Sequence, residues 1–351
     1  LITKVIPEPS IEQIKSILIK AMKHANSYGI TSLQTDDLGG ESIINHPIIK
    51  AYFELQKENS LSCRIYQQSL LPDLGELKAF HEAGYNTGVG DEFFKFGPLK
   101  LLADGSLGAR TAALHNNYVD DKTTKGILIY KDKELKDIIS FAHQASMQIA
   151  VHCIGDRAMD QVLDIYEEVL KEFPKNDHRH GIVHCQIMSQ EIHNRFANNN
   201  IIAYIQPIFI HYLIVEKRVG SQLSKSSYAF KSLVNKGVRI AIGTDSPIEL
   251  INPFNNLYTA VSRKSLNKTP ENGWYPEEAL TIDEALKAYT IGSSYASFTE
   301  NIKGKLAKNF LADIAILSKD LYNIPTEEIL ETEVLMTILD GRVVYEKDFD
   351  N

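Results

Sequence analysis

Short apolar runs alternate with amphipathic stretches along most of this 351-residue chain, and this alternation restricts the fold more than any other feature. The unit occurs seven times: an apolar run typical of a buried strand, followed in most cases by apolar residues at helical spacing. Strands that alternate with helices form parallel sheets, and nearly continuous apolar strands are buried on both faces. The seven expected strands lie in residues 30–35, 61–70, 99–105, 148–155, 179–186, 201–207 and 238–246.

Seven copies of this unit exceed a typical open sheet and approach the eight of a (β/α)8 barrel. We therefore expect a TIM-type barrel over residues 1–305, with strands two to eight visible and the first strand absent. A doubly wound sheet is the alternative, but no glycine-rich dinucleotide fingerprint follows an early strand. Residues 306–351 differ, because they carry short strands and a turn at Asp340 and Gly341. They predict part of a small β-sandwich that includes a hairpin.

Composition and charge narrow the class of protein. The chain is 44% hydrophobic and 23% charged, which is typical of a globular protein with a large core. Its net charge of −8 argues against nucleic acid as a partner, and no apolar run approaches the roughly 20 residues that span a bilayer. Three widely spaced cysteines, Cys63, Cys153 and Cys185, fit a reducing compartment, so we expect a cytoplasmic protein. A homodimer stays open.

Polar side chains stand where the expected strands end, and (β/α)8 barrels carry their active sites at that edge. His152 and His184 are 32 residues apart, which is about one strand–helix unit. Imidazole nitrogens and carboxylate oxygens bind catalytic zinc-type ions, and a carboxylate beside such an ion can take the proton of an attacking water. The sequence therefore predicts a metal centre at the C-terminal edge. The strand-end residues are Lys100, His152, His184, Gln206 and Asp245.

Each of these residues also has a structural interpretation. A lone histidine beside apolar residues is most often part of the core, Lys100 can be a paired charge, and Asp245 can begin a turn. Cys153 and Cys185 alternate away from the neighbouring histidines, so we expect burial beneath the helices rather than metal binding.

Two further polar motifs favour structural roles. The histidines of "HRH" at 178–180 lie at the beginning of their strand, the face of a barrel that serves stability. Asp104 and Gly105 are typical of a turn.

Longer motifs together resemble the YtcJ-like (amidohydrolase-3) branch of the amidohydrolase superfamily. The similarity runs in order from about Ile11 to Tyr345, and "DGSLGARTA" and "HCIGDRA" are its most specific parts. It implies a (β/α)8 barrel with a small β-sandwich, and hydrolysis of amide-type C–N bonds of a small molecule at a metal centre, usually of zinc. The motifs are KLLADGSLGARTAAL, VHCIGDRAMDQVLDIYE, RHGIVHCQ, YIQP, IGTDSPIELINPF, GWYPEEALTIDEALKAYTIGSSYAS and GKLAKNFLADIAILSKD.

The resemblance also implies roles for single residues. His152 and His184 match metal ligands of the fifth and sixth strands, and His184 is a candidate to hold the developing oxyanion. Asp245 matches the eighth-strand aspartate that binds metal and activates water. Lys100 matches a position where a carboxylated lysine can bridge two metal ions, so one or two ions are expected. Val183 stands where the family commonly has glutamate, and nothing explains this difference.

Three residues are candidates for substrate binding. Arg110 and Arg157 follow strand-end motifs and can bind a substrate carboxylate through two hydrogen bonds. Loop anchoring through backbone carbonyls is the alternative for both arginines. Gln206, at the end of "YIQP", is the third candidate.

The main departure from the family lies at the front of the chain. The His-x-His pair of the first family strand has no counterpart before Ile30, so the sequence resembles the C-terminal two thirds of a member. We therefore expect this chain alone to bind zinc weakly and to hydrolyse little, whereas its parent is a working hydrolase. A non-catalytic binding or regulatory relative on the same barrel is the alternative, and a lyase or isomerase is a third possibility.

Overall fold

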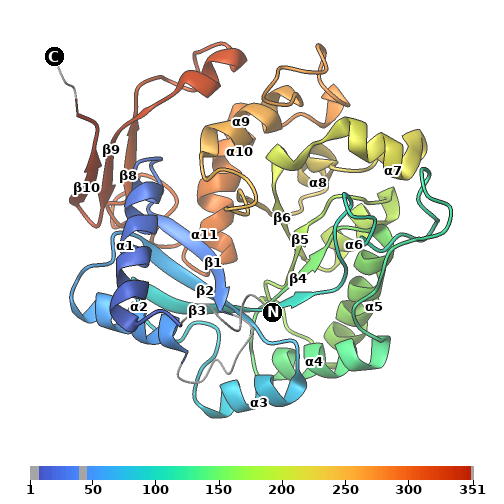
Figure 1. Cartoon of the computed structure of the whole chain (residues 1–351), viewed down its shortest axis with the longest axis horizontal. Coiled ribbons are helices and arrows are strands. Elements are labelled where there is room, and N and C mark those ends of the chain that lie inside the picture. Colours follow the sequence, from blue (N-terminus) through green and yellow to red (C-terminus); the bar gives the residue numbers. More distant parts are fainter. Residues whose placement is uncertain (1–7, 39–45, 349–351) are drawn as a thin grey trace.

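A computed structural model describes residues 8–38 and 46–348 and shows a curled parallel sheet with helices outside it (Figure 1). Seven strands lie in the order β1 to β7, and every neighbouring pair is parallel. This confirms the expected α/β fold with strands in chain order. The strands are β1 (Ser32–Leu38), β2 (Arg64–Leu70), β3 (Phe94–Leu102), β4 (Ile149–Cys153), β5 (Gly181–His184), β6 (Ile202–Ile205) and β7 (Ile240–Ile242).

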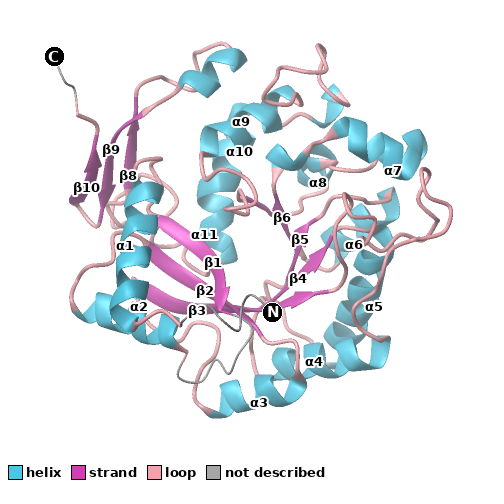
Figure 2. Cartoon of the chain, in the orientation of Figure 1, coloured by secondary structure: helices cyan, strands magenta, loops and turns pink. Residues whose placement is uncertain are grey.

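Amphipathic helices cover the outside of this sheet (Figure 2). In α5, for example, Val162, Tyr166 and Val169 recur at helical spacing and are all buried. The helices are α1 (Ile11–Asn26), α2 (Pro47–Lys57), α3 (Leu74–Glu82), α4 (Asp132–Gln144), α5 (Asp156–Glu172), α6 (Gln190–Asn198), α7 (Tyr212–Ser224), α8 (Phe230–Asn235), α9 (Pro253–Ser262), α10 (Ile282–Lys287) and α11 (Ser293–Ala296). Within the described ranges, none of them has the length and apolar composition needed to cross a bilayer.

The sheet curls but does not close among the described strands, because β1 and β7 each pair on one side only. The π-helical turn Ala288–Gly292 and α11 lie beside both edge strands. Gln34 on β1 donates a 3.0 Å hydrogen bond to the Ser293 carbonyl, and Gly292 packs against β7. A Cβ on Gly292 would lie 2.1 Å from the Ile240 carbonyl oxygen, so only glycine allows this approach.

The C-terminal strands form a separate antiparallel sheet, as expected. β8 (Ile314–Leu317), β9 (Val334–Leu339) and β10 (Arg342–Glu346) lie in the order β10-β9-β8. Asp340 and Gly341 have φ angles of 53° and 75° at the bend between β9 and β10, which confirms the predicted hairpin.

Strand register places the predicted metal ligands beside each other. His152 on β4 pairs with Leu102 on β3 and with Val183 on β5, and Cys153 pairs with His184. Cys153 and Cys185 have no exposed surface, which confirms that they belong to the core. The two histidines are thereby carried to the C-terminal ends of adjacent strands.

Candidate active site

The imidazoles of His152 and His184 face each other at the C-terminal edge of the sheet. Their ring centroids lie 4.4 Å apart, with the ring planes at 76°. His152 Nε2 lies 3.1 Å from the Gly105 carbonyl oxygen, and His184 Nδ1 lies 2.9 Å from Gln206 Oε1. Because both oxygens are acceptors, each of these nitrogens carries a hydrogen. The other ring nitrogen of each histidine therefore presents a lone pair.

Burial and a nearby positive charge keep both imidazoles neutral. Burial lowers the pKa of His152 to about 4, and the positive charge of Lys100 contributes in the same direction. Burial lowers the pKa of His184 well below its ordinary value, with further contributions from His152 and Lys100. Neutral imidazole is the form that binds a metal ion.

Lys100 and Asp245 belong to the same electrostatic neighbourhood. Lys100 Nζ lies 2.6 Å from Asp36 Oδ2, and the lysine side chain is nearly buried. Burial raises the pKa of Asp245, the charge of Lys100 opposes this rise, and Asp36 adds to it. Asp245 has a left-handed φ of 56° just beyond β7. A raised pKa brings a carboxylate closer to the range that suits a general base at neutral pH.

Asp36 was missed by the sequence reasoning, although its signal was present. It lies next to the last residue of the expected strand 30–35, so the strand-end rule that selected His152 also selects Asp36. In the structure it is part of β1 and the direct partner of Lys100.

Asp104, which the sequence predicts only as a turn residue, supports the site from the beginning of the β3–α4 loop. It is 2% exposed and accepts hydrogen bonds from the backbone N–H groups of Ala113, Ile154 and Gly155 at 2.8, 3.0 and 2.8 Å. These bonds hold the loop between β3 and α4 against the end of β4. Because Gly105 follows directly, Asp104 also fixes the carbonyl that orients His152.

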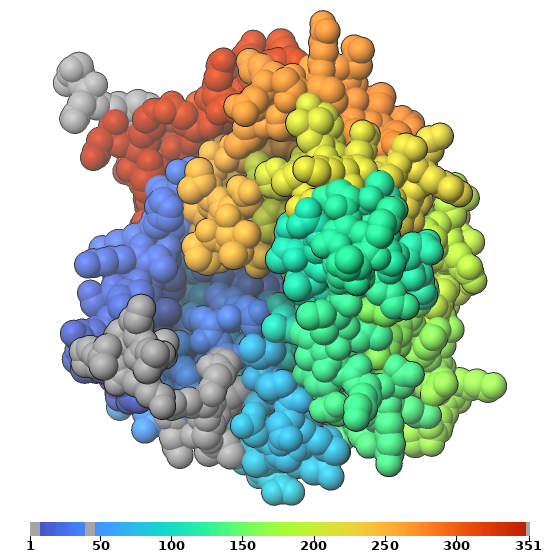
Figure 3. Space-filling model, turned by 45° about the vertical axis from the view of Figure 1, so that its right-hand side comes forward, coloured from blue at the N-terminus to red at the C-terminus, as the bar shows by residue number. Residues whose placement is uncertain are grey.

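The predicted substrate-binding residues have protein partners in this structure. Arg110 places Nε and Nη2 on the two carboxylate oxygens of Asp120, at 3.2 and 2.9 Å. Arg218 on α7 binds the same carboxylate, so the β3–α4 loop is tied to α7. Figure 3 shows this loop, in teal, on the surface beside the yellow segment that contains α7. These contacts match the loop-anchoring interpretation of Arg110, except that a carboxylate is the anchor.

Arg157 and Gln206 differ from Arg110 in their hydrogen-bond partners. Arg157 Nη2 donates to the Gly126 carbonyl at 3.2 Å, while its buried Nε has no partner among the described residues. Gln206 Oε1 accepts from His184, so Gln206 orients a candidate metal ligand. Substrate binding by Arg110, Arg157 and Gln206 stays a prediction.

The donor chemistry fits part of a metal centre. Two neutral imidazoles with free nitrogens on one wall suit a zinc-type ion. Within residues 8–38 and 46–348, however, no three His, Cys, Asp or Glu side chains converge closely enough to hold a metal ion. Metal binding by His152 and His184 stays a prediction, and the described residues do not complete a set of ligands around them.

A curled parallel sheet, with helices outside and polar residues at its C-terminal edge, places the chain in the α/β-barrel class. The sequence model of the amidohydrolase family matches residues 1–345, and the chain belongs to this family. It is 32% identical to the putative amidohydrolase YtcJ of Bacillus subtilis, over 99% of this chain and 64% of the relative. It is 29% identical to the protein LONG AFTER FAR-RED 3 of Arabidopsis thaliana, over 98% and 60%.

Solved structures agree with this assignment. The crystal structure of an uncharacterized metal-dependent hydrolase from Pyrococcus horikoshii matches with a TM-score of 0.76 and 29% identity, covering 91% of this chain and 62% of that one. A corresponding hydrolase from Pyrococcus furiosus matches with a TM-score of 0.73 and 30% identity, covering 86% and 59%. The chain thus spans less than two thirds of the length of these relatives.

Proposed function

We propose that this chain provides most of the active site of a metal-dependent amidohydrolase, which cleaves an amide-type C–N bond of a small molecule with an activated water. The proposal depends on the facing imidazoles of His152 and His184, each with one free nitrogen, in the electrostatic neighbourhood of Lys100 and Asp245. Two relatives of known structure bear the name metal-dependent hydrolase, which supports the same reading.

His152 and His184 would supply two ligands of a divalent ion, zinc by the preference of imidazole donors. Asp245 would join them only by moving closer, because no three such side chains converge among the described residues, and Lys100 would be a further ligand if it is carboxylated. When bound, such an ion lowers the pKa of a water toward neutrality and polarises a carbonyl. Lys100 pairs with Asp36 as an ammonium, so a bridging role would require that this ion pair open.

The proton transfers fall to Asp245. Its carboxylate takes the proton of the attacking water and then delivers it to the leaving nitrogen, and burial makes it a stronger base for the first step. His184 has one free nitrogen, which can serve either the ion or the developing oxyanion. We assign this nitrogen to the ion, because Gln206 already fixes the ring in the tautomer that a ligand needs.

Arg157 is the better of the two arginines for binding a substrate. Its Nε lacks a partner among the described residues, whereas both ends of the Arg110 fork are bound to Asp120. A substrate that carries a carboxylate would pair with the guanidinium of Arg157 and replace its Nη2 contact with the Gly126 carbonyl.

The test is hydrolysis of candidate amides, followed by release of the amine, in the complete protein loaded with zinc. Asp245→Asn keeps the shape of the side chain but removes the base, so kcat should fall by roughly 10²–10⁴-fold. Asp283→Asn, at a surface ion pair on α10, is the matched control and should leave turnover unchanged. Normal turnover of Asp245→Asn, with circular dichroism like that of the parent, would remove Asp245 from this role.

A non-catalytic binding or regulatory protein is the second candidate. It is favoured by the lack of a three-ligand group among the described residues. A relative that is 20% identical, AepA of Pectobacterium carotovorum, bears the name exoenzymes regulatory protein. Zinc binding without turnover of any amide by the complete protein would favour this second candidate.

A further inference from the structure

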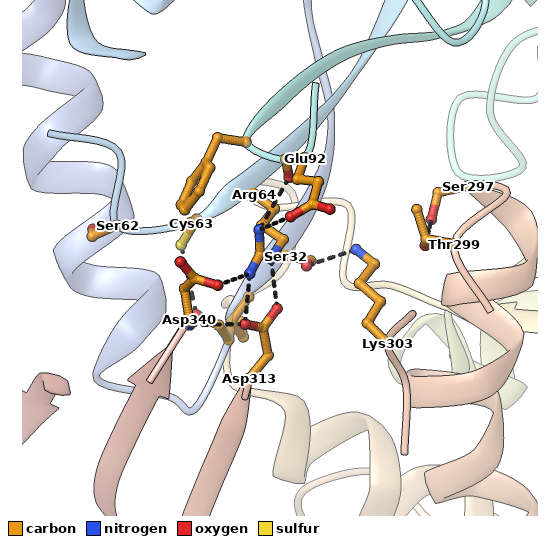
Figure 4. Close-up of polar contacts among 12 residues, drawn as sticks. Ser32, Ser62, Cys63, Arg64, Glu92, Ser297, Thr299, Lys303, Asp313 and Asp340 are labelled. Carbon is orange, nitrogen blue, oxygen red and sulfur yellow. Dashed lines mark hydrogen bonds and ion pairs between the residues drawn. The ribbon is translucent and has the colours of Figure 1, made fainter. Parts of the chain in front are cut away.

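A small cleft of about 30 Å³ lies at the opposite, N-terminal edge of the barrel sheet, next to the C-terminal sheet. Figure 4 shows several of its polar side chains, among them Arg64, Glu92 and Lys303, which come from segments far apart in the sequence. Arg64 begins β2, Lys95 lies near the start of β3, and Lys303 follows α11. The cleft is distinct from the candidate active site, which lies at the C-terminal ends of the same strands.

Arg64 is already neutralised by acidic partners. Its Nε and Nη2 donate to the two carboxylate oxygens of Asp313 at 2.7 and 3.0 Å, and Nη2 also contacts Asp340 at 3.3 Å. Glu92 lies 3.9 Å from Nη1. These contacts attach the C-terminal sheet to the barrel and leave Arg64 with little charge to offer a ligand.

The acidic side chain of Asp91 in the same lining is also committed. Its Oδ1 accepts from the backbone N–H groups of Phe93 and Phe94 at 2.8 and 3.1 Å, and its other oxygen accepts from Gln56. Asp91 therefore closes its own turn rather than serving as a counter-ion within the cleft.

Lys303 has no such neutralising partner. Its Nζ donates to Ser32 Oγ at 2.7 Å, and no carboxylate of the described residues lies within ion-pair distance of it. Lys95, in the same lining, likewise has no ion pair within the described part of the chain. Burial lowers the pKa of Lys303 to about 8. The charge of Asp313 raises this pKa, whereas the charges of Arg64 and Lys95 lower it. An ammonium group that is withdrawn from water normally has a counter-ion, but the partner of the Lys303 ammonium among the described residues is a neutral hydroxyl.

We propose that this cleft binds the carboxylate group of a small organic acid between Lys303 and Lys95. The Ser32 hydroxyl accepts from Lys303 and orients its ammonium. The volume suits a planar group of one carbon and two oxygens, and two unpaired ammonium groups supply the charge. The site is independent of the proposed hydrolase function.

Formate is the simplest probe, and lysine labelling is the sharpest readout. Near neutral pH, N-hydroxysuccinimidyl acetate should modify Lys303 quickly, because part of this amine is uncharged. A bound carboxylate favours the ammonium, so about 100 mM formate at constant ionic strength should slow labelling of Lys303 by roughly fivefold or more in a saturable manner. Lys20, exposed on α1, is the internal control and should be labelled at an unchanged rate.

Variants separate this site from a general salt effect. Formate should raise the melting temperature of the parent and of Lys303→Arg, which keeps the charge, but not of Lys303→Met. Ser32→Ala and Lys95→Met should each weaken the formate response several-fold, and they serve if Lys303→Met fails to fold. Equal slowing at Lys303 and Lys20, no slowing at Lys303, or an undiminished formate response of Lys303→Met would each overturn the proposal. Chloride at the same ionic strength should have no effect.

Discussion

Two pairs of histidines lie at opposite edges of the sheet: His152 on β4 with His184 on β5, and His143 on α4 with His180 just before β5. His143 Nδ1 lies 2.9 Å from His180 Nε2, and their remaining nitrogens contact the Phe173 carbonyl and the Ile149 N–H. All four nitrogens of this pair thus have protein partners. His152 and His184 instead each have one ring nitrogen that has no partner among the described residues. Hydrogen bonding, rather than residue type or burial, therefore separates a pair that stabilises the fold from a pair that can bind a ligand.

The largest expected difference between the pairs concerns zinc. His184→Ala should reduce zinc affinity by roughly 100-fold or more, because it removes a ligand and not merely a supporting contact. His180→Ala should leave zinc affinity unchanged but lower the free energy of unfolding by about 2–3 kcal/mol, since His143 and the Ile149 N–H lose buried partners. Calorimetric zinc titration and urea unfolding of both variants measure the contrast.

Two outcomes would break the comparison. Submicromolar zinc binding by His184→Ala would show that the ion lies elsewhere. Loss of zinc binding by a folded His180→Ala would show that the structural pair is part of the metal centre. We expect the unsubstituted chain to bind zinc more weakly than micromolar, because the described residues supply two imidazoles and no complete set of ligands.

The second prediction concerns stability in acid, where His152 and His178 should respond alike. Burial lowers the pKa of both His152 and His178 to about 4, whereas the unfolded chain has histidines of ordinary pKa near 6.5. Below about pH 6.5 the unfolded state binds protons that the folded state does not, so stability falls as pH falls until the folded histidines protonate near pH 4. Between pH 6.5 and 5 each of these groups should cost about 2 kcal/mol of unfolding free energy.

Urea unfolding at neutral pH and near pH 5 measures this loss. His178→Asn should reduce the slope of this pH dependence by about one proton, because it removes one of the two groups. An unfolding free energy that is equal at both pH values would contradict the expectation for both sites.

The strand-end residues could be predicted because parallel strands in chain order finish at one edge, whatever the packing of their neighbours. That rule places His152, His184 and Asp245 at this edge and, applied fully, also Asp36 and Asp104. It does not predict the role of Asp104, whose partners Ala113, Ile154 and Gly155 lie in a loop and a strand end that only the folded chain brings together.

Some elements were harder to predict for local reasons. β3 begins at Phe94, five residues before the expected start. Gly97 and Pro98 are unfavourable within strands and interrupt the apolar run, so the sequence pattern places the start of the strand after them. The helical pattern over residues 281–297 is divided in the structure by a π-helical turn at Ala288–Gly292. In α7, Gly220 has non-helical backbone angles, so one uninterrupted helical period does not run through this segment.

The smallest expected effect tests the hydrogen bond that distinguishes the two pairs. Gln206→Leu removes the acceptor for the His184 Nδ1 hydrogen but keeps the length of the side chain. The ring is then free to exchange its tautomers, so zinc affinity should fall by roughly tenfold, at the lower end of what such supporting contacts contribute. Gln186→Leu, at a neighbouring buried glutamine after β5, is the control and should leave zinc affinity unchanged. An equal fall in both variants would mean that packing around β5 and β6, rather than the tautomer of His184, governs the affinity.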